Sequence, residues 1–171
     1  TIVLVDNTFE PKQEVRATLI KVENVGQCVL NLLEMYNASR PRKTGISKLA
    51  SIHEGATLGE GCYVGDFSVV EATAKIGANV QIYPQCYVGD NVVIGDNCHI
   101  MAHASILSGT RMGKNNRIFH GAVIGGIPQD LKFVGEDTTL EIGDNNMIRE
   151  NVTLNRGTAS KGKTVVGSNN C

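Results

Sequence analysis

A short polar cluster made of Gln129, Asp130 and Lys132 lies where an otherwise regular sequence pattern breaks. It brings an amide, a carboxylate and an ammonium group close together in the chain. Such groups can bind a ligand that carries hydroxyl, amide and phosphate groups, so we interpret the segment as a polar clamp. The alternative is a solvated corner with incidental charges, and these residues alone leave both interpretations open.

The four histidines are the other candidates for chemistry: His53, His99, His103 and His120. Their spacings suggest no pair of metal ligands on one corner, so we predict no metal site. His120 comes shortly before the polar cluster and could face the same groove, where it would be a candidate general base. A hydrated histidine in a turn is the alternative interpretation.

The element that must position these residues is a repeat of six residues. An aliphatic residue, once a methionine, stands at every sixth position: Ile46, Ile52, Leu58, Val64, Val70, Ile76, Ile82, Val88, Ile94, Ile100, Ile106, Met112, Ile118 and Ile124. A helix has a period of about 3.6 residues and a simple strand a period of about two. A strict period of six instead predicts short strands joined by tight turns and stacked as a parallel β-helix.

The other positions of the repeat agree with this fold. Two residues before the aliphatic position the side chain is mostly small, and both positions lie on the same face of a strand, so we expect both to point inward. We expect the glycine that often follows to supply turn conformations that a Cβ forbids. These glycines are Gly59, Gly65, Gly77, Gly89, Gly95, Gly113 and Gly125.

The cysteines support the same core. Cys62, Cys86 and Cys98 occupy the small inward position, so we interpret them as compact apolar fillers rather than disulfide or metal-binding residues. The sequence contains five cysteines and no Cys-x-x-Cys pair.

Two segments interrupt the repeat. Residues 127–139 lack the glycine rhythm, and the repeat resumes in phase at Ile142, Ile148 and Leu154. An insertion that keeps the phase predicts a loop at one corner of the solenoid, where binding sites are usually built. Residues 156–163 form a second break, which is Gly-rich and basic.

The chain is predicted to have two parts. Residues 1–37 contain two strand candidates and a helical pattern, and predict a partial α/β segment. Residues 38–45 form a linker with Pro, Gly and basic residues. Residues 46–171 form the all-β solenoid. We expect both ends to be truncated, because the first part is too short for its own core and the last coil is incomplete.

Composition argues against several functional classes. The net charge is −1 and no basic stripe stands out, which argues against a dedicated nucleic-acid binder. No apolar run is long enough to span a bilayer and no signal-peptide pattern opens the chain, so a cytoplasmic protein is expected.

The stretch 120–170, with its IPQDLKF, IGDNN and NRGT segments, closely resembles the acyl-ACP–UDP-N-acetylglucosamine O-acyltransferases of lipid A biosynthesis. The resemblance covers residues 46–171. It implies a left-handed parallel β-helix, an exception to the right-handed crossover rule, and a homotrimer with active sites between subunits. It also implies transfer of a 3-hydroxyacyl chain from acyl carrier protein to the 3-hydroxyl of UDP-N-acetylglucosamine, without a metal or a cofactor beyond the phosphopantetheine arm of the carrier.

The resemblance also assigns residues. Gln129, Asp130 and Lys132 match positions that line the sugar-nucleotide site, and Asn155 stands where some members have a histidine near the substrate. The general base of the family is a histidine in a motif that would follow Cys171. We therefore predict no catalytic residue in this chain, with His120 as the fallback candidate, and little activity for the chain alone.

Residues 2–45 instead resemble the end of the uridine-binding domain of the UDP-3-O-acylglucosamine N-acyltransferases, which act later in the same pathway. N-acyltransfer is therefore an alternative function, and a non-catalytic solenoid is another. The stretch after HGAVIG reads GIPQDLKF rather than the Gly/Phe-rich sequence of the N-acyltransferases, so we predict O-acyltransfer.

Overall fold

The structure, a computed structural model, describes residues 1–39 and 41–171. It divides into two compact units, Thr1–Arg42 and Lys43–Cys171, and this boundary falls within the predicted linker of residues 38–45. In the described ranges no helix is long and apolar enough to cross a membrane.

The N-terminal unit contains both predicted strands and the predicted helix. Strand β1 (Ile2–Asp6) pairs in parallel with β2 (Thr18–Val22), and helix α1 (Val25–Ser39) follows. The helix begins at a cap, because the side-chain oxygen of Asn24 accepts a hydrogen bond from the backbone N–H of Gln27 at 2.9 Å.

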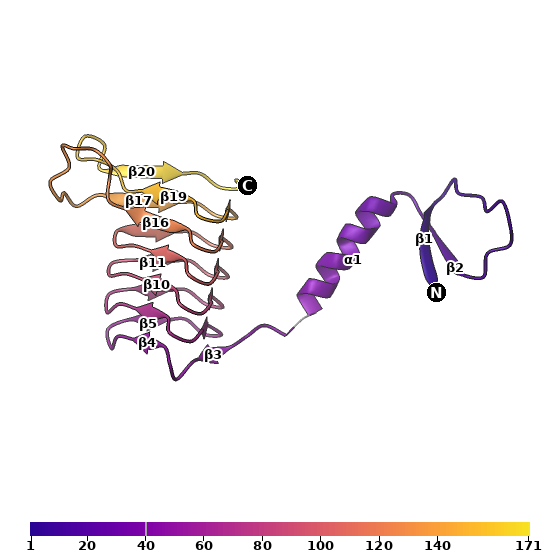
Figure 1. Cartoon of the computed structure of the whole chain (residues 1–171), viewed down its shortest axis with the longest axis horizontal. Coiled ribbons are helices and arrows are strands. Elements are labelled where there is room, and N and C mark those ends of the chain that lie inside the picture. Colours follow the sequence, from indigo (N-terminus) through magenta and orange to yellow (C-terminus); the bar gives the residue numbers. More distant parts are fainter. Residues whose placement is uncertain (40) are drawn as a thin grey trace. The chain divides into compact units, whose positions relative to one another are not determined.

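The second unit is a parallel β-helix with three faces, each a parallel sheet (Figure 1). Face 1 contains β3 (Gly45–Ile46), β6 (Tyr63–Val64), β9 (Gln81–Ile82), β12 (His99–Ile100), β15 (Arg117–Ile118) and β18 (Met147–Ile148). Face 2 contains β4 (Ser51–Ile52), β7 (Val69–Val70), β10 (Tyr87–Val88), β13 (Ser105–Ile106), β16 (Val123–Gly126) and β19 (Thr153–Asn155). Face 3 contains β5 (Thr57–Leu58), β8 (Lys75–Ile76), β11 (Val93–Ile94), β14 (Thr110–Met112), β17 (Thr139–Ile142) and β20 (Lys163–Val166).

The coils stack in a fixed register of 18 residues, which pairs Ile46 with Val64 and Val64 with Ile82. The aliphatic residue of each hexad therefore lies above its counterpart in the coil below. From Val64 to Ile148 these side chains form one continuous buried core together with the small inward residues, whereas Ile46 in the first strand is 53% exposed. The sequence prediction of a parallel β-helix is confirmed.

The predicted role of the glycines is wrong at most positions. Of the glycines predicted for this role only Gly125 has a positive φ, whereas asparagines such as Asn79, Asn97 and Asn115 adopt left-handed conformations at corners, with φ between 57° and 58°. Glycine follows the aliphatic residue for a different reason, which is the close approach of the next coil. A Cβ on Gly65 would lie 2.7 Å from the ring of Pro84, and one on Gly77 would lie 2.8 Å from the backbone N of Asp96.

The inward cysteines are buried and free, as predicted. Burial raises the pKa of both Cys86 and Cys98 to about 11, so their reactive thiolate forms are scarce at neutral pH. Cys62 donates a hydrogen bond through Sγ to the carbonyl oxygen of Gly77 at 3.1 Å.

A ladder of amide side chains, Asn116, Asn146 and Asn170, holds the coils together beyond the two breaks in the repeat. The Oδ1 atom of Asn116 accepts hydrogen bonds from the backbone N and the Nδ2 of Asn146, at 2.9 and 3.0 Å. Asn170 donates to Oδ1 of Asn146 in the same way, at 3.0 and 2.7 Å. Asn116 is 0% and Asn146 2% exposed, whereas Asn170 is exposed, so the amide ladder runs from a buried polar pair to the surface.

Replacing Asn146 by Ala should destabilise the protein by about 1–3 kcal/mol, because the backbone N–H of Asn170 loses its acceptor and Oδ1 of the buried Asn116 loses one of its two donors, the Nδ2 of Asn146. Urea unfolding followed by circular dichroism measures the change. The control is Thr153→Ala on the exposed side of β19, which should shift stability by less than about 0.5 kcal/mol. Equal stability of the two variants would contradict the role of the amide ladder.

Candidate functional site

Two loops leave the solenoid at the same corner. The first loop (residues 127–138) joins β16 to β17, and the second loop (residues 156–162) joins β19 to β20. Since β16 pairs with β19 and β17 pairs with β20, the loops belong to adjacent coils and both run from face 2 to face 3. They project from the same side of the stack in Figure 1, in orange and yellow.

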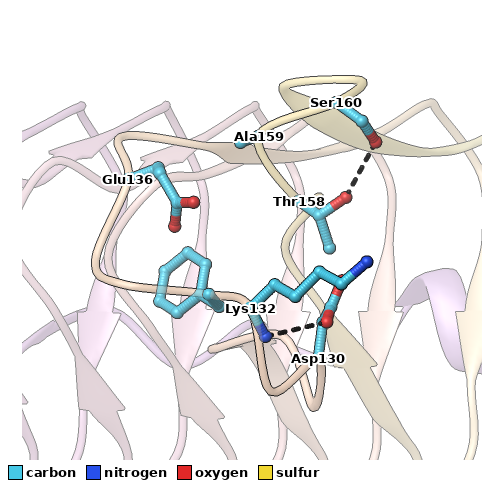
Figure 2. A pocket seen from close by; sticks show the side chains of 7 residues that line it. Asp130, Lys132, Glu136, Thr158, Ala159 and Ser160 are labelled. Atoms are coloured by element: carbon cyan, nitrogen blue, oxygen red, sulfur yellow. Dashed lines mark hydrogen bonds between the residues drawn. The ribbon is translucent and has the colours of Figure 1, made fainter.

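Residues of both loops line one cavity of about 300 Å³: Asp130, Lys132, Phe133, Glu136, Thr158, Ala159 and Ser160. Figure 2 shows Asp130 and Lys132 on the first loop opposite Thr158 on the second. The lining provides two carboxylates, one ammonium group, two hydroxyls and an aromatic ring. This set can accept hydrogen bonds from sugar hydroxyls and donate them to phosphate or amide oxygens.

The first loop is shaped by its own polar side chains. Oδ1 of Asp130 accepts a hydrogen bond from the backbone N of Lys132 at 3.0 Å, and the carbonyl oxygen of Asp130 accepts one from the backbone N of Phe133 at 2.9 Å. These bonds form a tight turn in which Asp side chains are favoured. Farther along, Glu136 accepts a hydrogen bond from the backbone N of Val134 at 3.0 Å.

The second loop is fixed at its base by backbone contacts. The N–H of Gly157 donates a hydrogen bond to the carbonyl oxygen of Thr139 at 3.1 Å. The N–H of Thr139 donates one to the carbonyl oxygen of Gly162 at 3.0 Å. A Cβ on Gly157 would lie 2.4–2.5 Å from backbone atoms of Lys163. At the tip of the loop the hydroxyls of Thr158 and Ser160 are hydrogen-bonded at 3.2 Å.

The four residues predicted to bind substrate separate into two groups. Asp130 and Lys132 line the cavity, whereas Gln129 is exposed and outside the lining. Asn155 also lies outside the lining, at the base of the loops, where its Oδ1 is 2.9 Å from the position of a Cβ on Gly126. Substrate contacts of Gln129 and Asn155 stay predictions.

The expectation that His120 faces the same groove is wrong within one chain. His120 lies in the turn between β15 and β16, at the corner between faces 1 and 2, whereas the first loop starts at the other end of β16. Its carbonyl oxygen accepts a hydrogen bond from the N–H of Asn151 at 3.1 Å, and it is not part of the cavity lining. Each step of six residues along the chain moves to the next face of the solenoid, so residues close in sequence can lie at different corners.

Histidine and acidic side chains meet elsewhere without forming a metal centre. Nε2 of His53 lies 3.3 Å from a carboxylate oxygen of Glu71. Across the described part of the chain, no group of three or more His, Cys, Asp or Glu side chains is placed to hold a metal ion.

The sequence did not predict that Thr158 to Ser160 of the second loop, and Phe133 and Glu136 of the first, line the cavity. A signal was available in the repeat itself. Both breaks follow a position of face 2, after Ile124 and after Leu154, and these two residues are paired in the structure. The hexad count alone therefore places the two loops on one corner.

Comparisons with known proteins agree with this architecture. A family described as bacterial transferase hexapeptide (six repeats) matches residues 73–108 and 91–126. An acyl-[acyl-carrier-protein]–UDP-N-acetylglucosamine O-acyltransferase of Chlorobaculum parvum is 50% identical over 122 residues, which are 71% of this chain and 42% of that protein. The corresponding enzyme of a Psychrobacter species is 49% identical over 126 residues, 73% of this chain and 39% of its own length.

Solved structures give the same result. The UDP-N-acetylglucosamine acyltransferase of Bacteroides fragilis is 56% identical, with a TM-score of 0.57, over 73% of this chain and 42% of its own. The Arabidopsis enzyme is 35% identical, with a TM-score of 0.70, over 73% of this chain and 45% of its own. The solenoid resembles these acyltransferases in sequence and in fold. The predicted resemblance and the left-handed parallel β-helix are thereby confirmed, and the chain spans about two fifths of the length of these relatives.

Replacing Gly157 by Ala should displace the second loop, because the added Cβ meets the backbone of Lys163. We expect a loss of about 1–3 kcal/mol in unfolding free energy and altered NMR amide shifts for Thr158 and Ser160. The matched control is Gly167→Ala, since no atom lies within 4 Å of the Cβ position there. If both variants gave the same shifts and stability, the close approach at Gly157 would be refuted.

Proposed function

We propose that the cavity between the two loops binds UDP-N-acetylglucosamine, and that the chain is the acceptor-binding part of an O-acyltransferase. One observation carries this proposal. Asp130 and Lys132 line a cavity together with Thr158 and Ser160, in a solenoid about half identical to enzymes named for acyl transfer to UDP-N-acetylglucosamine.

The polar groups of the cavity can each pair with a group of such an acceptor. The ammonium group of Lys132 can pair with a phosphate or donate to an acetamido oxygen. The carboxylates of Asp130 and Glu136 accept hydrogen bonds from sugar hydroxyls, and the hydroxyls of Thr158 and Ser160 both donate and accept. Among the described residues no histidine lines the cavity, so we assign it to acceptor binding rather than proton transfer.

In the proposed reaction, the 3-hydroxyl oxygen of the sugar attacks the thioester carbon of a 3-hydroxyacyl chain carried by acyl carrier protein. A C–O bond forms and the C–S bond breaks. The hydroxyl proton passes to a general base, and the phosphopantetheine thiolate leaves. The proposal requires no metal and no cofactor other than the carrier's own arm.

We also propose that the site is completed by other copies of the chain in a cytoplasmic homotrimer. The first loop supports this part of the proposal, because its apolar side chains Leu131 and Val134 are 102% and 88% exposed. Apolar side chains that stand in solvent beside a polar cavity are typical of surfaces that a partner covers.

The proposal is tested by titrating the ¹⁵N-labelled chain with UDP-N-acetylglucosamine. We expect saturable shifts of the amides of Lys132, Thr158 and Ser160. Lys132→Ala should weaken binding about tenfold or more, because a charge-assisted hydrogen bond of about 1.5–3 kcal/mol is lost. The control is Lys161→Ala, which removes an exposed ammonium group of the second loop outside the cavity lining and should leave the affinity unchanged.

Absence of loop shifts at millimolar nucleotide would refute the proposal and favour a non-catalytic solenoid. The same titration with UDP-3-O-acylglucosamine examines N-acyltransfer, the alternative that residues 2–45 suggest. Tighter binding of this amine acceptor than of UDP-N-acetylglucosamine would favour that alternative.

A further inference from the structure

Arg156 contacts the first loop outside the cavity. It begins the second loop, and its backbone N–H donates a hydrogen bond to the carbonyl oxygen of Gly126 at 2.8 Å. Gly126 is the last residue of β16, directly before the first loop. The start of one loop is therefore bonded to the start of the other.

The side chain of Arg156 extends this contact along the first loop. Its Nη1 donates a hydrogen bond to the carbonyl oxygen of Thr138 at 3.4 Å, and its guanidinium carbon lies 5.9 Å from the ring centroid of Phe133. Phe133 lines the cavity and Thr138 is the last residue of the loop, where it is 2% exposed. One guanidinium thus contacts both the middle and the end of the first loop.

The coil below leaves room for this side chain. Gly109 stands at the same corner, with φ of 82°. A Cβ there would lie 3.0 Å from Cδ of Arg156 and 2.9 Å from the carbonyl oxygen of Thr138. Gly109 therefore satisfies two requirements, a left-handed backbone and space for the Arg156–Thr138 contact.

The contact also contains unpaired polar atoms. Among the described residues, Nε of Arg156 and Oγ1 of Thr138 are buried without a hydrogen-bond partner. Buried polar groups are normally paired, and an unpaired one is destabilising. These two unpaired atoms lie at the contact between the two loops.

We infer that Arg156 is a positioning residue, which fixes the first loop against the second and thereby sets the spacing between Lys132 and Thr158. It does not line the cavity, so it acts through Phe133 and Thr138. A lysine cannot replace it, because only the planar guanidinium can stack on a ring while donating sideways to a carbonyl oxygen. The effect on ligand affinity rests on the proposed function, whereas the effect on loop order does not.

The test compares Arg156→Lys with the unaltered 171-residue chain, with Arg111→Lys on the exposed side of β14 as the matched control. The first readout is tryptic cleavage after Lys132, which lies in the first loop, followed by mass spectrometry. We expect cleavage about five- to tenfold faster in Arg156→Lys, as loss of a cation–π contact and a hydrogen bond would give. The control should match the unaltered chain.

The second readout is the affinity for UDP-N-acetylglucosamine measured by NMR. We expect Arg156→Lys to weaken binding about fivefold while the unfolding midpoint stays at that of the control, which a purely structural role would not produce. Phe133→Leu removes the cation–π contact from the other side but keeps the Arg156–Thr138 hydrogen bond, so it should increase cleavage by a smaller factor. If Arg156→Lys fails to fold, the cleavage rate of Phe133→Leu shows whether the Arg156–Phe133 contact orders the first loop.

Unchanged cleavage after Lys132 in both Arg156→Lys and Phe133→Leu would overturn the inference. If the unaltered chain binds no UDP-N-acetylglucosamine, the proposed function fails, and the cleavage rates still decide whether Arg156 positions the loop. Faster cleavage with unchanged affinity would limit Arg156 to loop stability and overturn its role in ligand binding.

Discussion

The register between successive coils is the constraint on which the solenoid and its site depend. Each strand hydrogen-bonds to the strands one coil away, as when the N–H of Val69 donates to the carbonyl oxygen of Cys86 at 2.9 Å. A slip of one residue would turn the aliphatic side chains outward. The two insertions keep the aliphatic side chains pointing inward. Paired residues are 18 positions apart in a regular coil, as Ile46 and Val64 are, but 30 apart when the first loop lies between them and 24 apart when the second loop does. The added lengths are whole hexads.

The site follows from that register. Because both insertions begin after face 2, the two loops emerge one above the other, and residues distant in sequence line a common cavity. The amide ladder holds the strands in line after each insertion. Arg156 then connects the loops themselves through Gly126, Thr138 and Phe133. The rigid coils supply the position of the site, and a few polar contacts supply its shape.

The sequence predicted the solenoid well because a six-residue period has few other physical explanations. It also predicted the place of Asp130 and Lys132, since an in-phase insertion must leave the stack at a corner. It failed for His120 because closeness along the chain does not mean closeness across three faces. It failed for the glycines because a repeat of Gly does not distinguish a left-handed turn from close approach of the next coil, as at Gly65. The contacts of Arg156 with Thr138 and Phe133 depend on side-chain geometry, which the six-residue repeat of the sequence does not reveal.

The most direct test of the central claim is a crystal structure of the chain soaked with UDP-N-acetylglucosamine. We expect density for the nucleotide sugar between the two loops, with the side chain of Lys132 and the hydroxyl of Thr158 or Ser160 within hydrogen-bond distance of it. Density bound elsewhere on the solenoid, or loops that lie apart with no shared cavity, would contradict the claim that coil register builds the acceptor site.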